Sequence, residues 1–436
     1  MKQTLLKKIN EKTAVVGVVG LGYVGLPLAV EKAKAGYKVI GFDVQAERVN
    51  MVNEGHNYIG DIVDKDLQMV IKDGLLKATV DYSLIKEVDC VAICVPTPLD
   101  AYQQPDISYV KASAEEIAKH MHAGMLVVLE STTYPGTTRE LVKPIIEKIS
   151  GLQCEKDFYL AFSPERVDPG NAYFKTKNTP KVVGGIGKDS TELAAALYGS
   201  ILESDIFQVS SPEVAEMEKI LENTYRNINI GLANEMAIIC DKMGINVWEV
   251  IEAAKTKPYG FQAFYPGPGI GGHCIPLDPY YLTWKAREYD YHTRLIEISG
   301  EINNYMPQYV VERSSRILNR FGKPLKDSKI LILGIAYKQD IDDYRESPAL
   351  KLIDNFSKEG SIVSYYDPYV TKFKYKGKRY EGCEFSKEML RSMDLVVVTT
   401  AHSTVDYEFV QKNSKMVFDT KNAMKKVEAR NNIEVL

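Results

Sequence analysis

The chain has 436 residues, of which 45% are hydrophobic and 26% are charged, and its formal net charge is -4. This length is enough for two or three domains that each bury a core, and the composition is that of an ordinary globular protein. A slightly acidic chain offers no case for nucleic acid or an anionic membrane as a partner.

The cysteines and the first 30 residues bear on the compartment. The six cysteines include no CxxC pair and no zinc spacing, so we expect thiols in a reducing compartment and no bound metal. Lysines near the start precede an uncharged run from Ala14 to Val30, which superficially resembles a signal peptide. Because the run contains four glycines and Pro27, it is better interpreted as a strand, a turn and a helix start. We therefore expect a cytoplasmic protein.

A glycine-rich turn follows an apolar strand predicted over residues 15–19. The letters GLGYVG, which begin at Gly20, match the GxGxxG pattern, and a second strand over 37–42 ends in Asp43. The first two glycines allow a tight turn and close approach of a pyrophosphate, and Asp43 would accept ribose hydroxyls and repel a 2′-phosphate. Arg48 could neighbour the adenosine or be a surface charge. This order predicts a dinucleotide site made by Gly20, Gly22, Tyr23, Val24, Gly25, Asp43 and Arg48.

Three further predicted strands end in polar turns. In open α/β sheets ligands bind beyond the carboxyl ends of the strands. Thr132 and Glu165 are therefore placed to face one crevice, although each could equally be a turn residue or a helix cap. The strands cover 89–95, 126–130 and 158–162, and the turns begin at Pro96-Thr97, Ser131 and Ser163.

A long helix is predicted from Ser211-Pro212 to Gly244, with apolar residues at helical spacing throughout. At 1.5 Å per residue it would be roughly 45 Å long, enough to separate two α/β domains and carry a subunit interface. Lys219 and Asn223 share one face of it. Taken alone, they are better explained as a solvated lysine and an ordinary helix asparagine.

The stretch GPGIGGHCIPLD, from Gly267 to Asp278, holds one cysteine, Cys274. Its glycines at 269, 271 and 272 are expected to give positive φ and close approach to a ligand. Asp278-Pro279 predicts a helix start, which places Cys274 just before a helix N-terminus, where partial positive charge favours a thiolate. A rigid loop suits a nucleophile, but a small buried residue in a tight turn fits the pattern equally well.

The last third predicts a second α/β domain, without GxGxxG. Its first strand, 329–333, is followed by a charged loop in which Lys338 and Arg345 could contact a phosphorylated ligand. A solvated surface loop is the alternative. Further strands are predicted over 361–366, 394–400 and 416–419.

These motifs together resemble those of the UDP-glucose/GDP-mannose dehydrogenase family over nearly the whole chain. The resemblance rests on GLGYVGLPLA, STTYPGTT, the Lys219/Asn223 helix, GxGGxCxPxD and the Lys338–Arg345 loop, in that order. SPERVDPG, KTKPYGF and GGHCIPLDP look most like the UDP-N-acetylglucosamine 6-dehydrogenase branch. The resemblance implies two Rossmann-like doubly wound domains joined by a long central helix: an NAD-binding domain at 1–205, a central dimerisation domain at 206–320 and a UDP-sugar-binding domain at 321–436.

The resemblance also implies a double oxidation of a sugar C6 hydroxyl by NAD, for a bacterial surface polysaccharide precursor. Cys274 would trap the aldehyde as a thiohemiacetal and later carry a thioester. Lys219 and Asn223 would stabilise the C6 oxygen, Asp278 and Thr132 would hold a water, and Glu165 would promote hydrolysis. By the same resemblance, the cofactor would also contact Pro96, Thr97, Thr132 and Arg345, and the substrate would contact Glu165, Arg166, Val167, Lys219, Asn223, Tyr265, Gly271 and Lys338.

The chain departs from the UDP-glucose enzymes at four positions, which we interpret as room for an N-acetyl group. Pro169 stands where they have a second glutamate, Tyr265 where they often have lysine, His273 where they have a small residue, and Arg166 where they have an apolar one. UDP-N-acetylgalactosamine, UDP-N-acetylmannosamine and UDP-glucose remain alternative substrates. A single-oxidation hydroxyacid dehydrogenase would need neither the cysteine nor the second α/β domain, and an NAD-sensing regulatory protein would not need the catalytic set.

Overall fold

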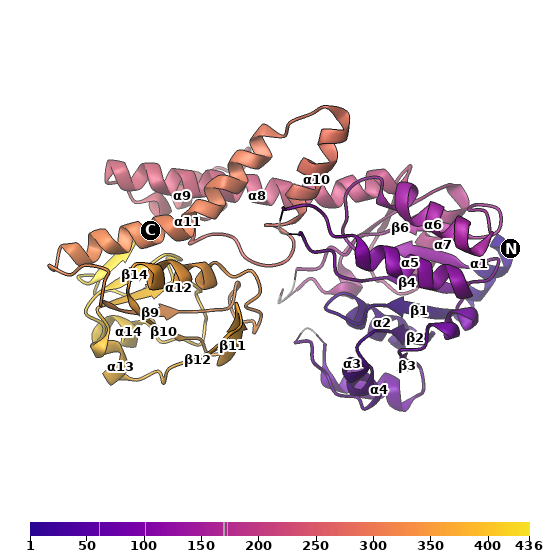
Figure 1. Ribbon diagram of the computed structural model, residues 1–436, viewed down its shortest axis with the longest axis horizontal. Helices are drawn as coiled ribbons and strands as arrows, with labels where there is room; N and C mark the ends of the chain where they lie inside the picture. The colour runs from indigo at the N-terminus through magenta and orange to yellow at the C-terminus, as the bar shows by residue number, and fades with distance from the viewer. Residues whose placement is uncertain (61, 101, 169–170, 172) are drawn as a thin grey trace. The chain divides into compact units, whose positions relative to one another are not determined.

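The computed structural model describes residues 1–60, 62–100, 102–168, 171 and 173–436. They form two compact units, each with its own sheet (Figure 1). The first comprises Met1–Glu222 and Tyr280–Tyr291, and the second comprises Asn223–Pro279 and His292–Leu436. No helix in the described ranges has both the length and the apolarity needed to cross a bilayer.

The first unit is built on an eight-stranded sheet in the order β3-β2-β1-β4-β5-β6-β7-β8. Neighbouring strands are parallel except β6 and β7, which are antiparallel. The central strands are runs of valine, leucine and isoleucine, as expected where both faces of a parallel sheet are covered. The strands are β1 Val15–Val19, β2 Lys38–Phe42, β3 Leu76–Thr79, β4 Cys90–Ile93, β5 Leu126–Leu129, β6 Tyr159–Phe162, β7 Lys181–Gly185 and β8 Ile206–Gln208.

Helices cover both faces of this sheet. They are α1 Lys2–Asn10, α2 Gly25–Lys34, α3 Ala46–Asn53, α4 Asp64–Lys72, α5 Ser108–His120, α6 Lys143–Ser150 and α7 Lys188–Gly199, with a π-helical turn at Thr137–Val142. Alternate residues along a strand point to opposite faces. Val16 and Val18 therefore lie in the apolar layer that includes α1, α2 and α7, whereas Val19 lies in the layer that includes α5 and α6.

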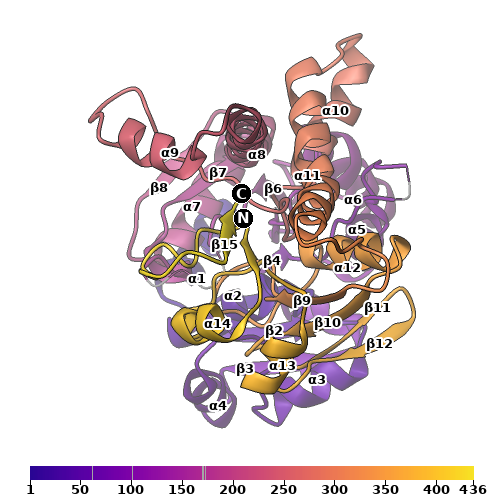
Figure 2. The same cartoon turned by 90° about the vertical axis from the view of Figure 1, so that its left-hand side faces the viewer.

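The second unit carries a five-stranded parallel sheet in the order β10-β9-β13-β14-β15. Ile330 and Ile332 face an apolar layer shared with α9, α11 and α12, and Leu331 and Leu333 face α13 and α14 on the other side (Figure 2). The elements are α9 Val247–Lys255, α11 Arg294–Asn319, β9 Lys329–Leu333, α12 Pro348–Lys358, β10 Ile362–Tyr366, the hairpin β11 Lys372–Tyr375 and β12 Lys378–Glu381, α13 Lys387–Ser392, β13 Leu395–Val398, α14 Tyr407–Asn413, β14 Val417–Asp419 and β15 Ile433–Val435.

Two helices belong to both units. The 32-residue helix α8, Pro212–Met243, passes from the first unit to the second after Glu222, and α10, Asp278–Ala286, returns to the first at Tyr280. The long helix and the two doubly wound domains predicted from the sequence are confirmed. The division into three domains stays a prediction, because the central helices of the second unit share one apolar cluster with its sheet, in which Trp248 and Met306 join Ile330.

Candidate functional site

The glycine-rich turn joins β1 to α2 at the carboxyl edge of the first sheet. Gly20 has a φ of +90°, and a Cβ there would lie 2.7 Å from the carbonyl oxygen of Cys94. A Cβ on Gly25 would lie 1.8 Å from the carbonyl oxygen of Gly20. At Gly22 a Cβ would meet nothing within 4 Å, which leaves open space beside the N-terminus of α2, as an anion site requires. Tyr23 is exposed and Val24 half-buried in the same turn.

Asp43 follows β2 and is 4% exposed. Its Oδ2 accepts the N–H of Leu21 at 2.9 Å, and its Oδ1 accepts the N–H of Gln45 at 2.9 Å. Arg48 Nη1 lies 3.7 Å from Oδ2, so this arginine neighbours the carboxylate instead of standing as an isolated surface charge. The carboxylate is tied to the glycine-rich turn, where an acid can accept ribose hydroxyls. The residues present therefore fit a dinucleotide.

The loops after β4, β5 and β6 lie side by side at the same edge, because these strands are neighbours. The Thr97 hydroxyl donates to the carbonyl of Thr132 at 2.7 Å. Glu165 is partly exposed, and its Oε1 accepts the N–H groups of Arg166 and Val167, each at 2.8 Å. Pro96 is exposed in the first of these loops. The structure thus brings the residues predicted at these strand ends to one edge of one sheet.

Arg166 is held to α8 within the same unit. Its Nε donates to Glu222 at 3.1 Å and lies 3.4 Å from Glu218, and its Nη1 donates to the carbonyl of Pro180 at 3.0 Å. Burial and the neighbouring Glu222 raise the pKa of Glu218 to about 7. Lys219, on the same helix, is 7% exposed, so it is not the solvated lysine that its isolated sequence context favoured.

Cys274, in the second unit, is exposed, whereas Cys90, Cys94 and Cys240 are buried. Its carbonyl oxygen accepts the N–H of Leu277 at 3.1 Å and that of Asp278 at 2.9 Å. This turn leads directly into α10, so the cysteine precedes a helix N-terminus, as predicted. The alternative of a buried packing cysteine is excluded by its exposure.

Asparagines of α8 anchor the exit of the cysteine loop. Asn223 Nδ2 donates to Asp278 Oδ2 at 2.6 Å, and both residues are nearly fully buried. One turn further, Asn227 Nδ2 donates to the carbonyl of Ile275 at 2.9 Å. The ordinary-asparagine interpretation of Asn223 is therefore wrong, because its amide fixes the acid that opens α10.

A second pair of asparagines, which the sequence prediction missed, anchors the entry of the loop. Asn234 Oδ1 accepts the N–H of Gly267 at 2.9 Å, and Asn234 Nδ2 donates to Asn303 Oδ1 on α11 at 2.9 Å. Asn303 in turn donates to the carbonyl of Asn227 at 3.0 Å. The available signal was the helical spacing of Asn223, Asn227 and Asn234 on one face of α8.

Glycine is required in the cysteine loop for two different structural reasons. Gly269 and Gly272 have φ of +129° and +88°, as predicted. The prediction of positive φ at Gly271 is wrong. A Cβ there would lie 2.6 Å from Tyr337 Cβ and 3.0 Å from the carbonyl oxygen of Glu346. Close packing on the loop after β9 therefore accounts for this glycine.

His273 connects the cysteine loop to that same charged loop. Its Nε2 lies 3.6 Å from Asp343 Oδ2, and Arg345 binds Asp343 with Nε at 2.9 Å and Nη2 at 2.7 Å. Burial opposes ionisation of Asp343, but the hydrogen bonds from Arg345 and the nearby side chain of His273 outweigh it and hold its pKa well below the ordinary range. Arg345 and the half-buried Lys338 thus belong to an ordered loop, and Arg345 is fixed by an internal carboxylate.

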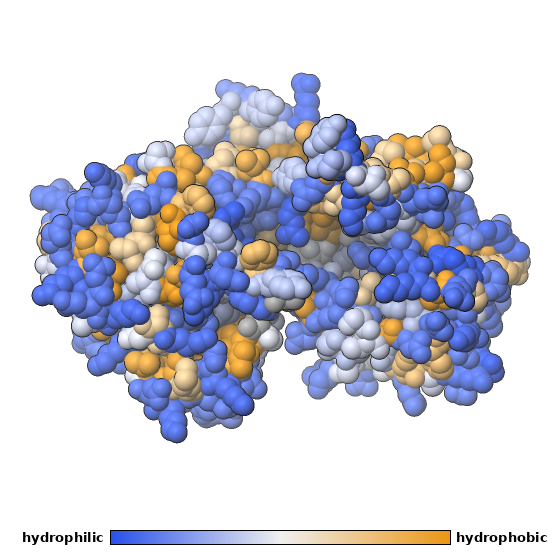
Figure 3. All heavy atoms as spheres, turned by 180° about the vertical axis from the view of Figure 1, so that it is seen from behind, coloured by the Kyte–Doolittle hydropathy of each residue, from blue (hydrophilic) through white to orange (hydrophobic). Residues whose placement is uncertain are grey.

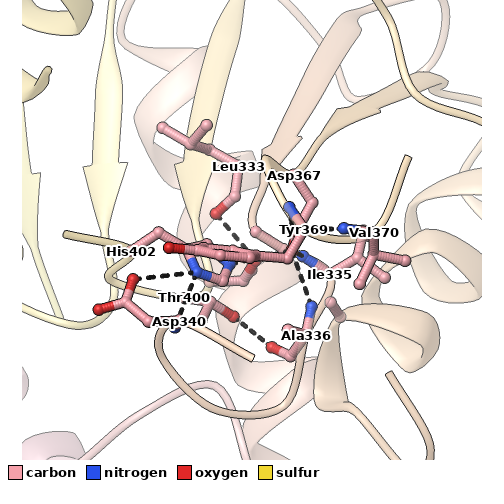
Figure 4. A network of polar contacts seen from close by, with 12 residues as sticks. Leu333, Ile335, Ala336, Asp340, Asp367, Tyr369, Val370, Thr400 and His402 are labelled. Carbon is pink, nitrogen blue, oxygen red and sulfur yellow. Dashed lines mark hydrogen bonds and ion pairs between the residues drawn. The ribbon is translucent and has the colours of Figure 1, made fainter. Parts of the chain in front are cut away.

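The charged loop is also held by a buried histidine (Figure 4). His402, 1% exposed, accepts the N–H of Asp340 at Nδ1, so its proton is on Nε2, which donates to Asp367 Oδ2 at 3.0 Å. Asp367 Oδ2 also accepts the N–H groups of Ile335 and Ala336. Three loops at the carboxyl ends of β9, β10 and β13 are thereby joined.

One predicted position, Tyr265, lies apart from these contacts, and another is not among the described residues. Tyr265 is 38% exposed, stacks on Trp248 with ring centroids 5.9 Å apart, and donates to Glu252 on α9 at 2.7 Å. Pro169 and Gly170, which end the SPERVDPG motif, lie outside the described residues. The structure describes the motif only from Ser163 to Asp168.

Comparison with known proteins agrees with this geometry. Sequence models of the UDP-glucose/GDP-mannose dehydrogenase family match the chain with the NAD binding domain at residues 14–202, the central domain at 213–305 and the UDP binding domain at 331–426. A UDP-N-acetyl-D-mannosamine dehydrogenase from Pyrococcus horikoshii is 36% identical over 417 residues, which are 94% of this chain and 96% of that protein. A UDP-N-acetyl-D-glucosamine 6-dehydrogenase from Pseudomonas aeruginosa is 36% identical over 356 residues, 82% of this chain and 83% of the relative.

Solved structures give the same result. The structure of the UDP-D-ManNAc dehydrogenase from Pyrococcus horikoshii superposes with a TM-score of 0.89 at 34% identity, over 97% of this chain and 98% of that one. The chain therefore belongs to the UDP-glucose/GDP-mannose dehydrogenase family, and its cofactor is NAD.

Proposed function

We propose that this NAD-dependent UDP-sugar dehydrogenase oxidises the C6 hydroxyl of a UDP-N-acetylhexosamine to the carboxylate, in two steps. The observation that carries the proposal is the exposed Cys274, held by buried asparagines in a loop that leads into α10. An exposed thiol on a rigid loop suits covalent trapping of an aldehyde. A single-oxidation hydroxyacid dehydrogenase would have no use for this arrangement.

The cysteine accounts for the second oxidation. NAD+, when bound, accepts a hydride at each of the two oxidations. Addition of the Cys274 thiol to the C6 aldehyde gives a thiohemiacetal, which keeps the carbon bound and again carries a C–H bond and a hydroxyl. Its oxidation gives a thioester, and water then releases the carboxylate and restores the thiol. Each sugar thus consumes two NAD+ and one water and yields two NADH and three protons.

The roles of the other residues follow from the family resemblance and the chemistry of their side chains. Lys219 and Asn223 stabilise negative charge on the C6 oxygen. Asp278 and Thr132 hold a water for proton transfer, and Glu165 promotes hydrolysis of the thioester. Support comes from the burial of Lys219 and Asn223, which strengthens their interaction with a developing charge.

The substrate assigned first is UDP-N-acetylglucosamine, on the likeness of SPERVDPG, KTKPYGF and GGHCIPLDP to that branch of the family. UDP-N-acetylmannosamine is the second candidate, because the relative from Pyrococcus horikoshii named for that sugar is as similar to this chain as the glucosamine enzyme. NADH production from a panel of UDP-N-acetylglucosamine, UDP-N-acetylmannosamine, UDP-N-acetylgalactosamine and UDP-glucose decides among them by kcat/KM.

The covalent mechanism is tested at Cys274. Single-turnover assays should give two NADH for each sugar, and Cys274→Ala should abolish uronate formation because no adduct can form. Cys274→Ser can still attack the aldehyde, but its oxygen ester should hydrolyse more slowly than a thioester, so mass spectrometry should detect an acyl-enzyme. One NADH per sugar, or uronate made by Cys274→Ala at the wild-type rate, would exclude the mechanism.

A further inference from the structure

The first unit contains a buried ion pair that no role assigned so far uses. Glu130 follows β5 directly and is 1% exposed, and Lys181 begins β7 and is 5% exposed. Lys181 Nζ donates to Glu130 Oε2 at 2.9 Å, and the Tyr198 hydroxyl donates to Glu130 Oε1. Burial of charged side chains costs desolvation energy even when they are paired, and the loss of one partner would leave the other charge uncompensated. The presence of this ion pair therefore requires an explanation.

The antiparallel direction of β7 explains how a lysine reaches this place. Phe162 of β6 pairs with Gly184 of β7, so the first residue of β7 lies beyond the carboxyl end of β6. Continued one residue at a time, the same register brings Lys181 opposite Glu165. A parallel strand would have placed its first residue at the other edge of the sheet.

The ammonium of Lys181 has three acceptors around it. Besides Glu130, it donates to the carbonyl of Pro164 at 3.1 Å and lies 3.9 Å from Glu165 Oε2. The other oxygen of Glu165, Oε1, is held by the N–H groups of Arg166 and Val167. Lys181 therefore fixes both the backbone before Glu165 and the one carboxylate oxygen that the backbone does not hold.

Lys181 remains charged despite its burial. Burial lowers its pKa, but Glu130 and Glu165 raise it by more, and the net effect is a pKa above the ordinary value. Its Nζ also lies 4.9 Å from the centroid of the Tyr198 ring, a favourable position for a cation. A permanent positive charge thus stands beside the Glu165 carboxylate.

We propose that Lys181, supported by Glu130, is a positioning residue that holds Glu165 in place for hydrolysis of the Cys274 thioester. This inference rests on the proposed function. Loss of the lysine leaves Glu165 present but no longer fixed, so both oxidations should proceed and only release of the product should slow. A misplaced catalytic group costs on the order of 100-fold in rate.

The test uses a double variant, because Lys181→Met alone would leave Glu130 buried and unpaired. In Lys181→Met/Glu130→Gln both buried charges are removed together, and the Tyr198 hydroxyl can still donate to the glutamine. We expect a burst of two NADH per subunit, an acyl adduct on Cys274 by mass spectrometry, a steady-state kcat about 10- to 100-fold lower, and an unchanged Kd for NAD. If the two substitutions only disrupted the fold, the affinity for NAD would fall and no adduct would form on Cys274.

Two controls separate the possible failures. Lys177→Met removes an exposed lysine of the same segment, which pairs with Glu203 at 2.6 Å, and should behave as wild type. Glu165→Gln should accumulate the same adduct as the double variant. If wild type releases no NADH from any UDP-sugar, the proposed function fails. If wild type and Glu165→Gln behave as proposed but the double variant turns over normally, or slows without an adduct, only the role of Lys181 is overturned.

Discussion

Asp43 and Asp367 hold equivalent places in the two sheets, each just after the strand that lies beside the first strand. In both units Oδ2 accepts the N–H of the residue that follows the first glycine, Leu21 in one and Ile335 in the other. Asp367 accepts further hydrogen bonds from Ala336, Tyr369, Val370 and His402. The carboxylate of Asp367 is therefore occupied by hydrogen bonds from within the protein, whereas the carboxylate of Asp43 can still accept hydrogen bonds from a ligand.

Asp43 should therefore select NAD over NADP. Asp43→Asn removes the charge that repels a 2′-phosphate and weakens the hydrogen bonds to ribose. We expect kcat/KM with NAD to fall about 10- to 100-fold, the value of one or two hydrogen bonds to a charged group, and kcat/KM with NADP to rise. The exposed Glu47→Gln, at the start of α3, is the control. Equal or better use of NADP by the wild-type enzyme would contradict the assignment.

Because of Asp367, the free energy of unfolding of the second unit should instead fall at acidic pH. Burial opposes ionisation, but hydrogen bonds from His402 and from the N–H of Ala336 lower its pKa from 3.8 to about 2. A lowered pKa contributes stability that is fully present above pH 3.8 and is lost as the pH falls through 2. The contribution is about 2 kcal/mol.

The measurement needs a reporter confined to the second unit. The chain has two tryptophans, and Trp248 lies in the apolar cluster of the second unit. In a Trp284→Phe background, Trp248 fluorescence in urea should show that Asp367→Asn is less stable than its parent at pH 7 and that the difference shrinks by about 2 kcal/mol at pH 2. A difference that is independent of pH would show that Asp367 does not ionise as inferred.

At the scale of elements, the sequence predicted what periodicity and turn chemistry determine. Five of the eight strands of the first sheet, four of the five strands of the second sheet and the 32-residue helix α8 were predicted to within a few residues. The helix α1 and the strands β3, β7, β8 and β15 were not predicted, and neither was the reversed direction of β7. The residue pattern of a short strand does not indicate its direction in the sheet. The direction of β7 is set by its antiparallel pairing with β6. The role of Lys181 depends on that direction, so it could not be found from the sequence.

The buried asparagines show a second limit of prediction from the sequence. Asn227, Asn234 and Asn303 look like ordinary helix residues in the sequence, because a polar side chain at helical spacing is usually exposed. Their partners are backbone groups of the cysteine loop and one another, and these contacts exist only after α8 and α11 pack. The helical spacing places the asparagines of α8 on one face, but it does not show which distant backbone groups they bind.

Removal of one anchor should loosen the cysteine loop. Asn227→Ala leaves the Ile275 carbonyl without its donor, which should cost about 1–3 kcal/mol of stability. Because the loop carries Cys274, we also expect kcat for NADH production to fall about 10-fold or more while Kd for NAD is unchanged. Asn229→Ala is the matched control, since its amide donates to Tyr225 on α8 itself. Equal effects of the two substitutions would contradict the anchoring role.

At the scale of the whole molecule, α8 exposes an apolar stripe in the second unit that its own unit does not cover. Tyr225, Leu232 and Ile239 are seven residues apart and are 47%, 56% and 41% exposed, and Met243 is 66% exposed. In Figure 3 apolar side chains lie among hydrophilic ones near the upper edge of the view. Residues repeated every seven positions lie along one face of a helix, as in helix pairing.

We therefore predict that two copies of the chain associate through this stripe. In a twofold interface each residue is buried twice, so Leu232→Glu should cost about 3–6 kcal/mol of association free energy from lost apolar burial. That corresponds to a Kd about 100-fold to 20,000-fold higher. Sedimentation velocity at micromolar concentration should show a dimer for wild type and a 48.9 kDa monomer for the variant. Arg226→Gln, on another face of α8, is the control and should leave the dimer intact. If the wild-type protein is monomeric, or if Leu232→Glu is still dimeric, the stripe is not the interface.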